Sequence, residues 1–180
     1  AYLMVDFFFV LSGFVIALSY INRLKTFGDL SRFQTKRFLR LYPLHLLMLL
    51  IFLGIEFAKY IAEIKFGMVA NDRAFSENNL SAFVANLFLV QNWTLSGLTF
   101  NHPSWSISAE FFTYALFAVL LFISKANKIL LSLLLITFVV TFGISLNQTE
   151  MGTGNLTGGP LRCLYSFSIG VLIFLIYSKL

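Results

Sequence analysis

Long apolar runs separated by short polar connections make up the pattern of this chain. A helix needs about 20 predominantly apolar residues to span a membrane. Six runs approach that length and predict membrane segments at residues 3–21, 41–62, 82–98, 105–123, 129–146 and 161–177. The pattern therefore predicts an all-α fold, a polytopic transmembrane helical bundle.

The boundaries of these segments differ in how clearly they are marked. Pro43 is the third residue of segment 41–62, and because proline is tolerated in a first helical turn, we expect the helix to begin there. Residues 63–80 form a polar connection. Segment 82–98 is short for a span, so we expect it to be re-entrant, tilted or extended.

The composition points to the same class of protein. Of the residues, 58% are hydrophobic and only 12% are charged, with a mean hydropathy of +0.84. A soluble domain carries about 25% charged residues, and a soluble domain of this length could not bury so much apolar surface. Cys163 is the single cysteine, so no internal disulfide can form.

The basic residues predict the orientation in the membrane. Six of them crowd the connection after the first apolar run, namely Arg23, Lys25, Arg32, Lys36, Arg37 and Arg40. Short connections rich in Lys and Arg stay in the cytoplasm, beside anionic lipid, so this connection is predicted to be cytoplasmic. If segment 82–98 dips in and returns, Lys125 and Lys128 face the cytoplasm too; if it spans, they face outward. The charge rule favours the re-entrant alternative.

Basic stretches also bind nucleic acid, but the flanking membrane segments argue against that partner.

Two of the carboxylates in or beside apolar runs, Asp6 and Glu110, are candidates for function, because such a group costs roughly 2.5 to 3.5 kcal/mol at the bilayer centre. Asp6 is at the mouth of the first run, and either a functional role or contact with interfacial water fits that position. Glu110 lies inside the run that opens on Trp105, one helical turn past Ser106. It needs a partner or a proton, which favours a general base over a structural ion pair.

The pair Arg37 and Arg40 has the i, i+3 spacing that puts both side chains on one helix face. Arginine binds phosphate groups bidentately, so the pair suits a phosphate or pyrophosphate. A plain positive-inside anchor is the alternative, and charge alone favours it. His45 and His102 are each expected to be structural. They are far apart, with no cysteine near either, so no metal site is predicted.

Three motifs in chain order resemble those of one family. They are VDFFFVLSGFVI at 5–16, RFLRLYP at 37–43 and PSWSISAEFFTY at 103–114. Together they resemble the signature segments of the acyltransferase-3 family of membrane O-acyltransferases, of the carbohydrate O-acetylase type. The resemblance ends at Tyr114, and the segments beyond it rest on hydropathy alone.

The resemblance implies a fold of about ten transmembrane helices, of which residues 1–180 would be a partial membrane acyltransferase domain, incomplete at both ends. It implies transfer of an acyl group, often acetyl, from acyl-CoA to a hydroxyl of a cell-envelope or exported carbohydrate at a bacterial cytoplasmic membrane. By matched position, Asp6 would be the carboxylate of the first motif. Arg37 and Arg40 would hold the CoA phosphates. The catalytic cavity would be lined by Trp105, Ser106 and Glu110.

One departure from the family concerns histidine. The family's essential His lies on the helix before the first motif, and neither His45 nor His102 matches it. Residues 1–180 alone are therefore expected to be inactive. Two other functions stay open. A transporter or flippase of a polar or anionic substrate would place Glu110 on its path, but would be expected to show an internal repeat, which we do not find. A scaffold without chemistry would merely pair its buried charges.

Overall fold

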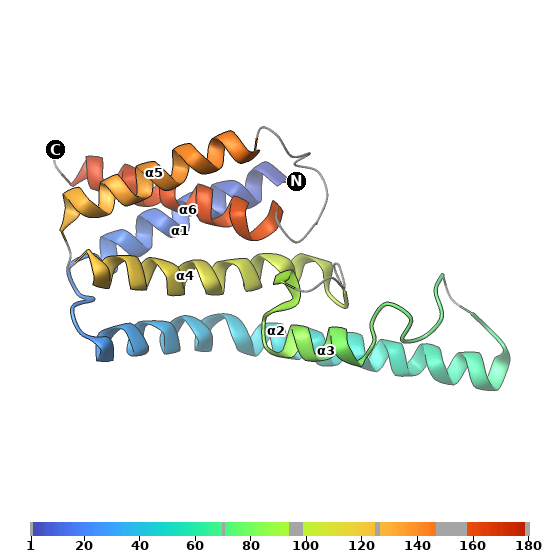
Figure 1. The fold of residues 1–180 in the computed structure, drawn as a ribbon. Helices are drawn as coiled ribbons and strands as arrows, with labels where there is room; N and C mark the ends of the chain where they lie inside the picture. Colours follow the sequence, from blue (N-terminus) through green and yellow to red (C-terminus); the bar gives the residue numbers. More distant parts are fainter. Residues whose placement is uncertain (1, 70, 94–98, 125–126, 147–157, 179–180) are drawn as a thin grey trace.

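The computed structural model describes residues 2–69, 71–93, 99–124, 127–146 and 158–178, and within them its regular elements are all helices (Figure 1). The elements in chain order are α1 (Tyr2–Tyr20), α2 (Phe27–Phe66), α3 (Leu80–Leu87), the 3₁₀ turns η1 (Gln91–Trp93) and η2 (His102–Ser104), α4 (Trp105–Ile123), α5 (Lys128–Leu146) and α6 (Gly158–Tyr177). Within this part of the chain, α1, α2, α4 and α6 are long and apolar enough to span a membrane. The prediction of an all-α bundle is confirmed.

Helix α2 is a single helix of 40 residues, and Pro43 lies inside it rather than in its first turn. Its start is determined locally. Thr26 accepts from the Asp29 N–H and the Asp29 carboxylate accepts from the Thr26 N–H, which forms a capping box. Contacts to α3 hold the helix together around Pro43, because Tyr42 donates to the Leu87 carbonyl at 3.1 Å. Such contacts offset the roughly 3 kcal/mol that an interior proline costs.

The segment after α2 does not form a spanning helix in its described part. Helix α3 has eight residues, about 12 Å of rise, and it lies along α2 (Figure 1). The buried ring of His45 fixes this arrangement, since its Nε2 lies 2.8 Å from the Asn86 carbonyl oxygen. Residues 94–98 lie outside the described residues. The re-entrant placement of segment 82–98 stays a prediction.

Helices α1, α4 and α6 run in the same direction, and α2 runs against them. Tyr114 of α4 packs on Phe167 of α6, and the following turn, Phe117, packs on the same ring. The ends of α1 and α4 and the start of α2 therefore meet at one end of the bundle (Figure 1). Lys128, which opens α5 just after α4 ends, lies at that same end. This is the arrangement that the re-entrant alternative requires.

The closest contact between two helices is between α1 and α6, where glycines bring the backbones together. A Cβ at Gly13 would collide with the Phe167 carbonyl oxygen, and a Cβ at Gly170 would collide with that of Val10. Small residues allow this approach and so increase the dispersion contact between helices in a membrane. On the neighbouring turn, the rings of Phe14 and Phe174 meet edge to face at 5.8 Å.

Replacing either contact glycine by alanine is expected to separate α1 from α6. Gly13→Ala and Gly170→Ala should each destabilise the full-length protein by about 1–3 kcal/mol, because the added methyl meets backbone rather than a movable side chain. Thermal unfolding in detergent measures the effect. Gly54→Ala in α2 is the matched control, since nothing lies within 4 Å of its added Cβ. Equal melting temperatures for all three variants would contradict the contact.

Candidate active site

A cavity of about 230 Å³ lies between α1, α2 and α4. It is where the three sequence motifs meet. Its described lining is Phe8, Leu11, Ser12, Val15 and Ile16 from α1, Arg37 and Arg40 from α2, and Glu110 and Tyr114 from α4. The cavity thus unites three of the residues singled out from the sequence, the two arginines and Glu110.

The carboxylate of Glu110 is held by two hydroxyl groups. Ser12 Oγ donates to Glu110 Oε1 at 3.2 Å, and the Tyr114 hydroxyl donates to the same oxygen. The two hydroxyl oxygens are 2.7 Å apart, which closes a triangle between α1 and α4. Within the described residues, Glu110 is in no ion pair with Lys or Arg, and its Oε2 has no hydrogen bond. One carboxylate oxygen is therefore oriented and the other is free to accept a proton.

The two arginines approach the cavity differently. The guanidinium of Arg37 lies against three aromatic rings, with its Cζ 5.3 Å from the ring centre of Tyr20, 5.5 Å from Phe33 and 5.7 Å from Tyr114. These rings hold the cation in place. Arg37 Nε is buried and has no hydrogen-bond partner among the described residues. Arg40 lines the same cavity and is exposed. Both can donate to an anionic group.

The structure places Asp6 elsewhere, in an ion pair with Arg162 of α6. Arg162 Nε donates to Asp6 Oδ1 at 2.6 Å and Nη2 donates to Oδ2 at 2.5 Å, which is a bidentate pair. Asp6 is half-buried and does not line the cavity. This placement gives Asp6 a structural partner, and its catalytic role stays a prediction. Sequence reasoning missed Arg162, although a charged residue in the last apolar run was the available signal.

Trp105 and Ser106 are also outside the cavity lining. The Trp105 indole packs edge to face on Phe9, with ring centres 6.0 Å apart, in a cluster that includes buried Cys163. Ser106 Oγ donates to the Pro103 carbonyl at 3.0 Å, so it closes the turn that opens α4. The residues that sequence reasoning gave no role, Ser12 and Tyr114, take their place at the cavity. Both stand inside the quoted motifs.

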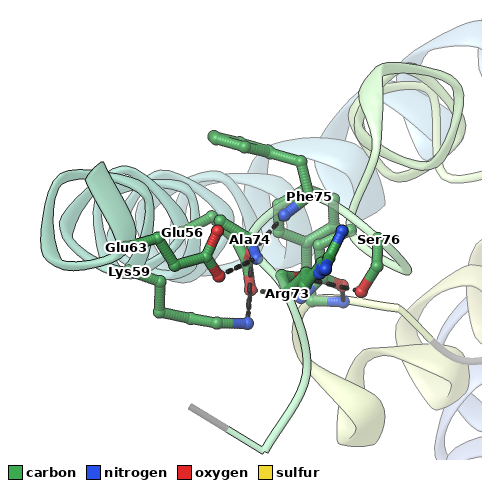
Figure 2. Close-up of polar contacts among 9 residues, drawn as sticks. Glu56, Lys59, Glu63, Arg73, Ala74, Phe75 and Ser76 are labelled. Carbon is green, nitrogen blue, oxygen red and sulfur yellow. Dashed lines mark hydrogen bonds and ion pairs between the residues drawn. The ribbon is translucent and has the colours of Figure 1, made fainter. Parts of the chain in front are cut away.

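A different carboxylate, the buried one of Glu56, shows what a structural acid looks like in this fold. It accepts from the Phe75 N–H at 2.8 Å, from Asn78 Nδ2 at 2.8 Å and from Lys59 Nζ at 3.1 Å. Figure 2 shows Glu56 and Lys59 of α2 beside Phe75 of the connection that follows it, with Glu63 accepting from the Ala74 N–H nearby. Both oxygens of Glu56 are used, in contrast to Glu110.

Among the histidines, the expected structural role fits the placement. His45 is buried against α3, and His102 is exposed in the 3₁₀ turn before α4. Neither lines the cavity at Glu110 within the described residues.

The fold and the cavity define a helical integral membrane protein in which a hydroxyl-held carboxylate and two arginines face one space. The model of a family described as "Acyltransferase domain" matches residues 1–180, so the chain belongs to this family and the resemblance drawn from the three motifs is confirmed. Acyltransferase MdmB of Streptomyces mycarofaciens is 36% identical over 118 residues, which cover 63% of this chain and 26% of that relative. No solved structure matches the chain.

The Asp6–Arg162 pair is expected to stabilise the fold rather than to act on a substrate. Asp6→Asn and Arg162→Gln should each lower the thermal stability of the full-length protein. The double variant should be at least as stable as the less stable of the two single variants. A coupling free energy of about 1–3 kcal/mol is the expected size for a half-buried contact pair. Loss of activity in Asp6→Asn at unchanged thermal stability would instead assign Asp6 to the chemistry.

Proposed function

We propose that the protein transfers an acyl group, acetyl being the expected one, from acyl-CoA to a hydroxyl of a cell-envelope or exported carbohydrate. The observation that carries the proposal is the convergence of Glu110, Arg37 and Arg40 on one cavity. Membership of the acyltransferase family supports the reaction class. The protein of this proposal lies in a bacterial cytoplasmic membrane. The end of the bundle that carries the basic residues faces the cytoplasm, where acyl-CoA is found.

Transfer from a thioester to a hydroxyl requires a group that takes the hydroxyl proton. The acceptor oxygen forms a bond to the acyl carbon, the carbon–sulfur bond breaks, and the thiolate leaves and receives a proton. Glu110 suits the first proton transfer, because Ser12 and Tyr114 orient it through Oε1 while Oε2 has no hydrogen bond within the described chain. A general base is effective when it is held within hydrogen-bond reach of the proton it removes.

The arginines suit the donor rather than the acceptor. CoA carries a diphosphate, and a guanidinium binds such oxygens through two parallel N–H donors. Arg37 is held between rings with a buried Nε that has no partner in the described chain, so an acceptor there would satisfy a donor that otherwise costs about 1–3 kcal/mol. The positive-inside anchor does not account for that buried donor.

Glu110→Gln is expected to abolish most of the acyl transfer while the protein still folds. Gln keeps the shape and accepts from Ser12 and Tyr114, but it cannot take a proton. In the full-length protein the rate should fall at least about 10²-fold, the low end for a lost acid–base group. Glu110→Asp should retain partial activity. Mass spectrometry of the acceptor carbohydrate measures the transfer, with protein level quantified in the same membranes.

Glu77→Gln is the control for Glu110→Gln, because Glu77 is exposed and outside the cavity. It should keep wild-type turnover. Near-normal turnover in Glu110→Gln would make Glu110 structural, and disappearance of that variant from the membrane would move the proton-transfer role to another group.

Arg37→Lys and Arg40→Lys are expected to weaken acyl-CoA binding by about tenfold each, because Lys keeps the charge but loses the bidentate donor pair. Equilibrium binding of labelled acyl-CoA to the purified full-length protein is the measurement. Arg73→Lys is the matched control, because Arg73 is exposed in the connection between α2 and α3 and does not line the cavity. Unchanged affinity in both cavity variants would leave the anchor interpretation standing.

A further inference from the structure

A second cavity, of about 200 Å³, is lined by residues at the end of α1 and the start of α2. Figure 1 shows that these two helix ends lie at the same end of the bundle. The second cavity shares no lining residue with the cavity at Glu110. Its described lining is Tyr20, Arg23, Leu24, Asp29, Arg32, Phe33 and Lys36. Three of these side chains are cations that come from two different segments, the α1–α2 connection and the first turns of α2.

The charge of this second cavity is not neutralised by the protein. Arg23, Arg32 and Lys36 supply three positive charges against the one negative charge of Asp29, a net charge of +2. The Asp29 carboxylate is already used at the capping box, where it accepts from the Thr26 hydroxyl at 2.8 Å and the Thr26 N–H at 3.0 Å. None of the three cations is in an ion pair within the described chain.

Membrane orientation alone does not explain this grouping. A positive-inside anchor needs basic residues near the membrane but not around one concave surface. Lys25 makes the comparison, since it belongs to the same basic stretch, is exposed and does not line the cavity. Three cations around one cavity repel one another, and an anion bound between them would offset this repulsion.

The second cavity and the cavity at Glu110 lie along one side of α2. Arg32, Lys36 and Arg40 follow each other at four-residue intervals, about 6 Å of rise each. Arg37 stands between the two cavities, because its guanidinium lies on the rings of Tyr20 and Phe33, which line the second one. A ligand with several anionic groups would meet cations over about 12 Å of helix between Arg32 and Arg40.

We propose that the second cavity binds a phosphate monoester, the 3′-phosphate of the acyl-CoA donor; this assignment rests on the proposed function. The thioester must reach Glu110, and in CoA the diphosphate lies between the thioester arm and the ribose that carries the 3′-phosphate. We therefore expect Arg37 and Arg40 to bind the diphosphate, and the second cavity, which is farther from Glu110, to bind the phosphate monoester. A phosphate monoester carries about −1.5 to −2 charges at neutral pH, which complements the net charge of the cavity.

Binding of acetyl-CoA and of 3′-dephospho-acetyl-CoA to the full-length protein in nanodiscs of neutral phosphatidylcholine tests the assignment. Arg32→Gln and Lys36→Gln should each weaken acetyl-CoA binding about tenfold, the size expected for a lost charged hydrogen bond. The same variants should bind the dephospho compound as the wild type does. Lys25→Gln removes the same charge beside the cavity and should change neither affinity by more than about twofold.

The other outcomes overturn the assignment in distinguishable ways. Equal loss of both ligands in Arg32→Gln and Lys36→Gln would move the diphosphate to this cavity. Unchanged acetyl-CoA binding, together with loss of a thermal stabilisation by anionic phosphatidylglycerol, would make the phosphate that of a lipid headgroup. Wild-type protein that binds no acetyl-CoA would reject the proposed function itself, whereas wild-type binding with unaffected variants would reject only the assignment of this cavity.

Discussion

The backbone contact between α1 and α6 is the constraint on which the site depends. Gly13 and Gly170 let the two helices approach closely. A backbone carbonyl of the opposite helix occupies the space where a Cβ atom would stand at each glycine. Ser12, the neighbour of Gly13, lies about 100° around the helix from it, and its hydroxyl reaches Glu110 of α4. The Asp6–Arg162 pair adds a bidentate ion pair between the same two helices. In lipid, where apolar surface gives little drive to helix association, such close contact and polar pairing have to supply it.

The buried carboxylate of Glu56 and the half-buried carboxylate of Glu110 differ in how their oxygens are used. Glu56 uses both oxygens on three donors, and that saturation is how a buried charge is tolerated at low cost. Glu110 uses one oxygen, on two hydroxyls that carry no formal charge. These two neutral groups orient the carboxylate of Glu110 without an ion pair to Lys or Arg in the described chain. This difference, more than burial itself, separates the candidate base from the structural acid.

Sequence reasoning found what depends on local pattern and on one residue at a time. The apolar runs, the shared face of Arg37 and Arg40 and the unusual position of Glu110 were all predictable. The start of α2 was also predictable locally, since Thr26 and Asp29 have the spacing of a capping box. The prediction that the helix begins at Pro43 was wrong because proline is tolerated in a first turn but does not require one. Long-range pairing was not predictable: no periodicity tells which cation meets Asp6. The contacts of Trp105 and Ser106 were not predictable for the same reason. Helical spacing predicts which residues share a face, but not which neighbouring helix covers that face.

The continuity of α2 through Pro43 has a consequence for how the basic residues act. A helix that began at Pro43 would leave the preceding arginines on a separate segment, free to move relative to the cavity. In the continuous helix they are in fixed register with α4, because Gln34 Nε2 donates to the Phe111 carbonyl at 3.2 Å and Phe38 packs on the Phe111 ring. These two contacts set the rotation of α2 about its axis, and that rotation turns Arg37 and Arg40 toward Glu110. A preorganised set of donors loses less entropy when an anion binds than a mobile set does. The helix that carries the cations is thus also the element that aligns them with the carboxylate.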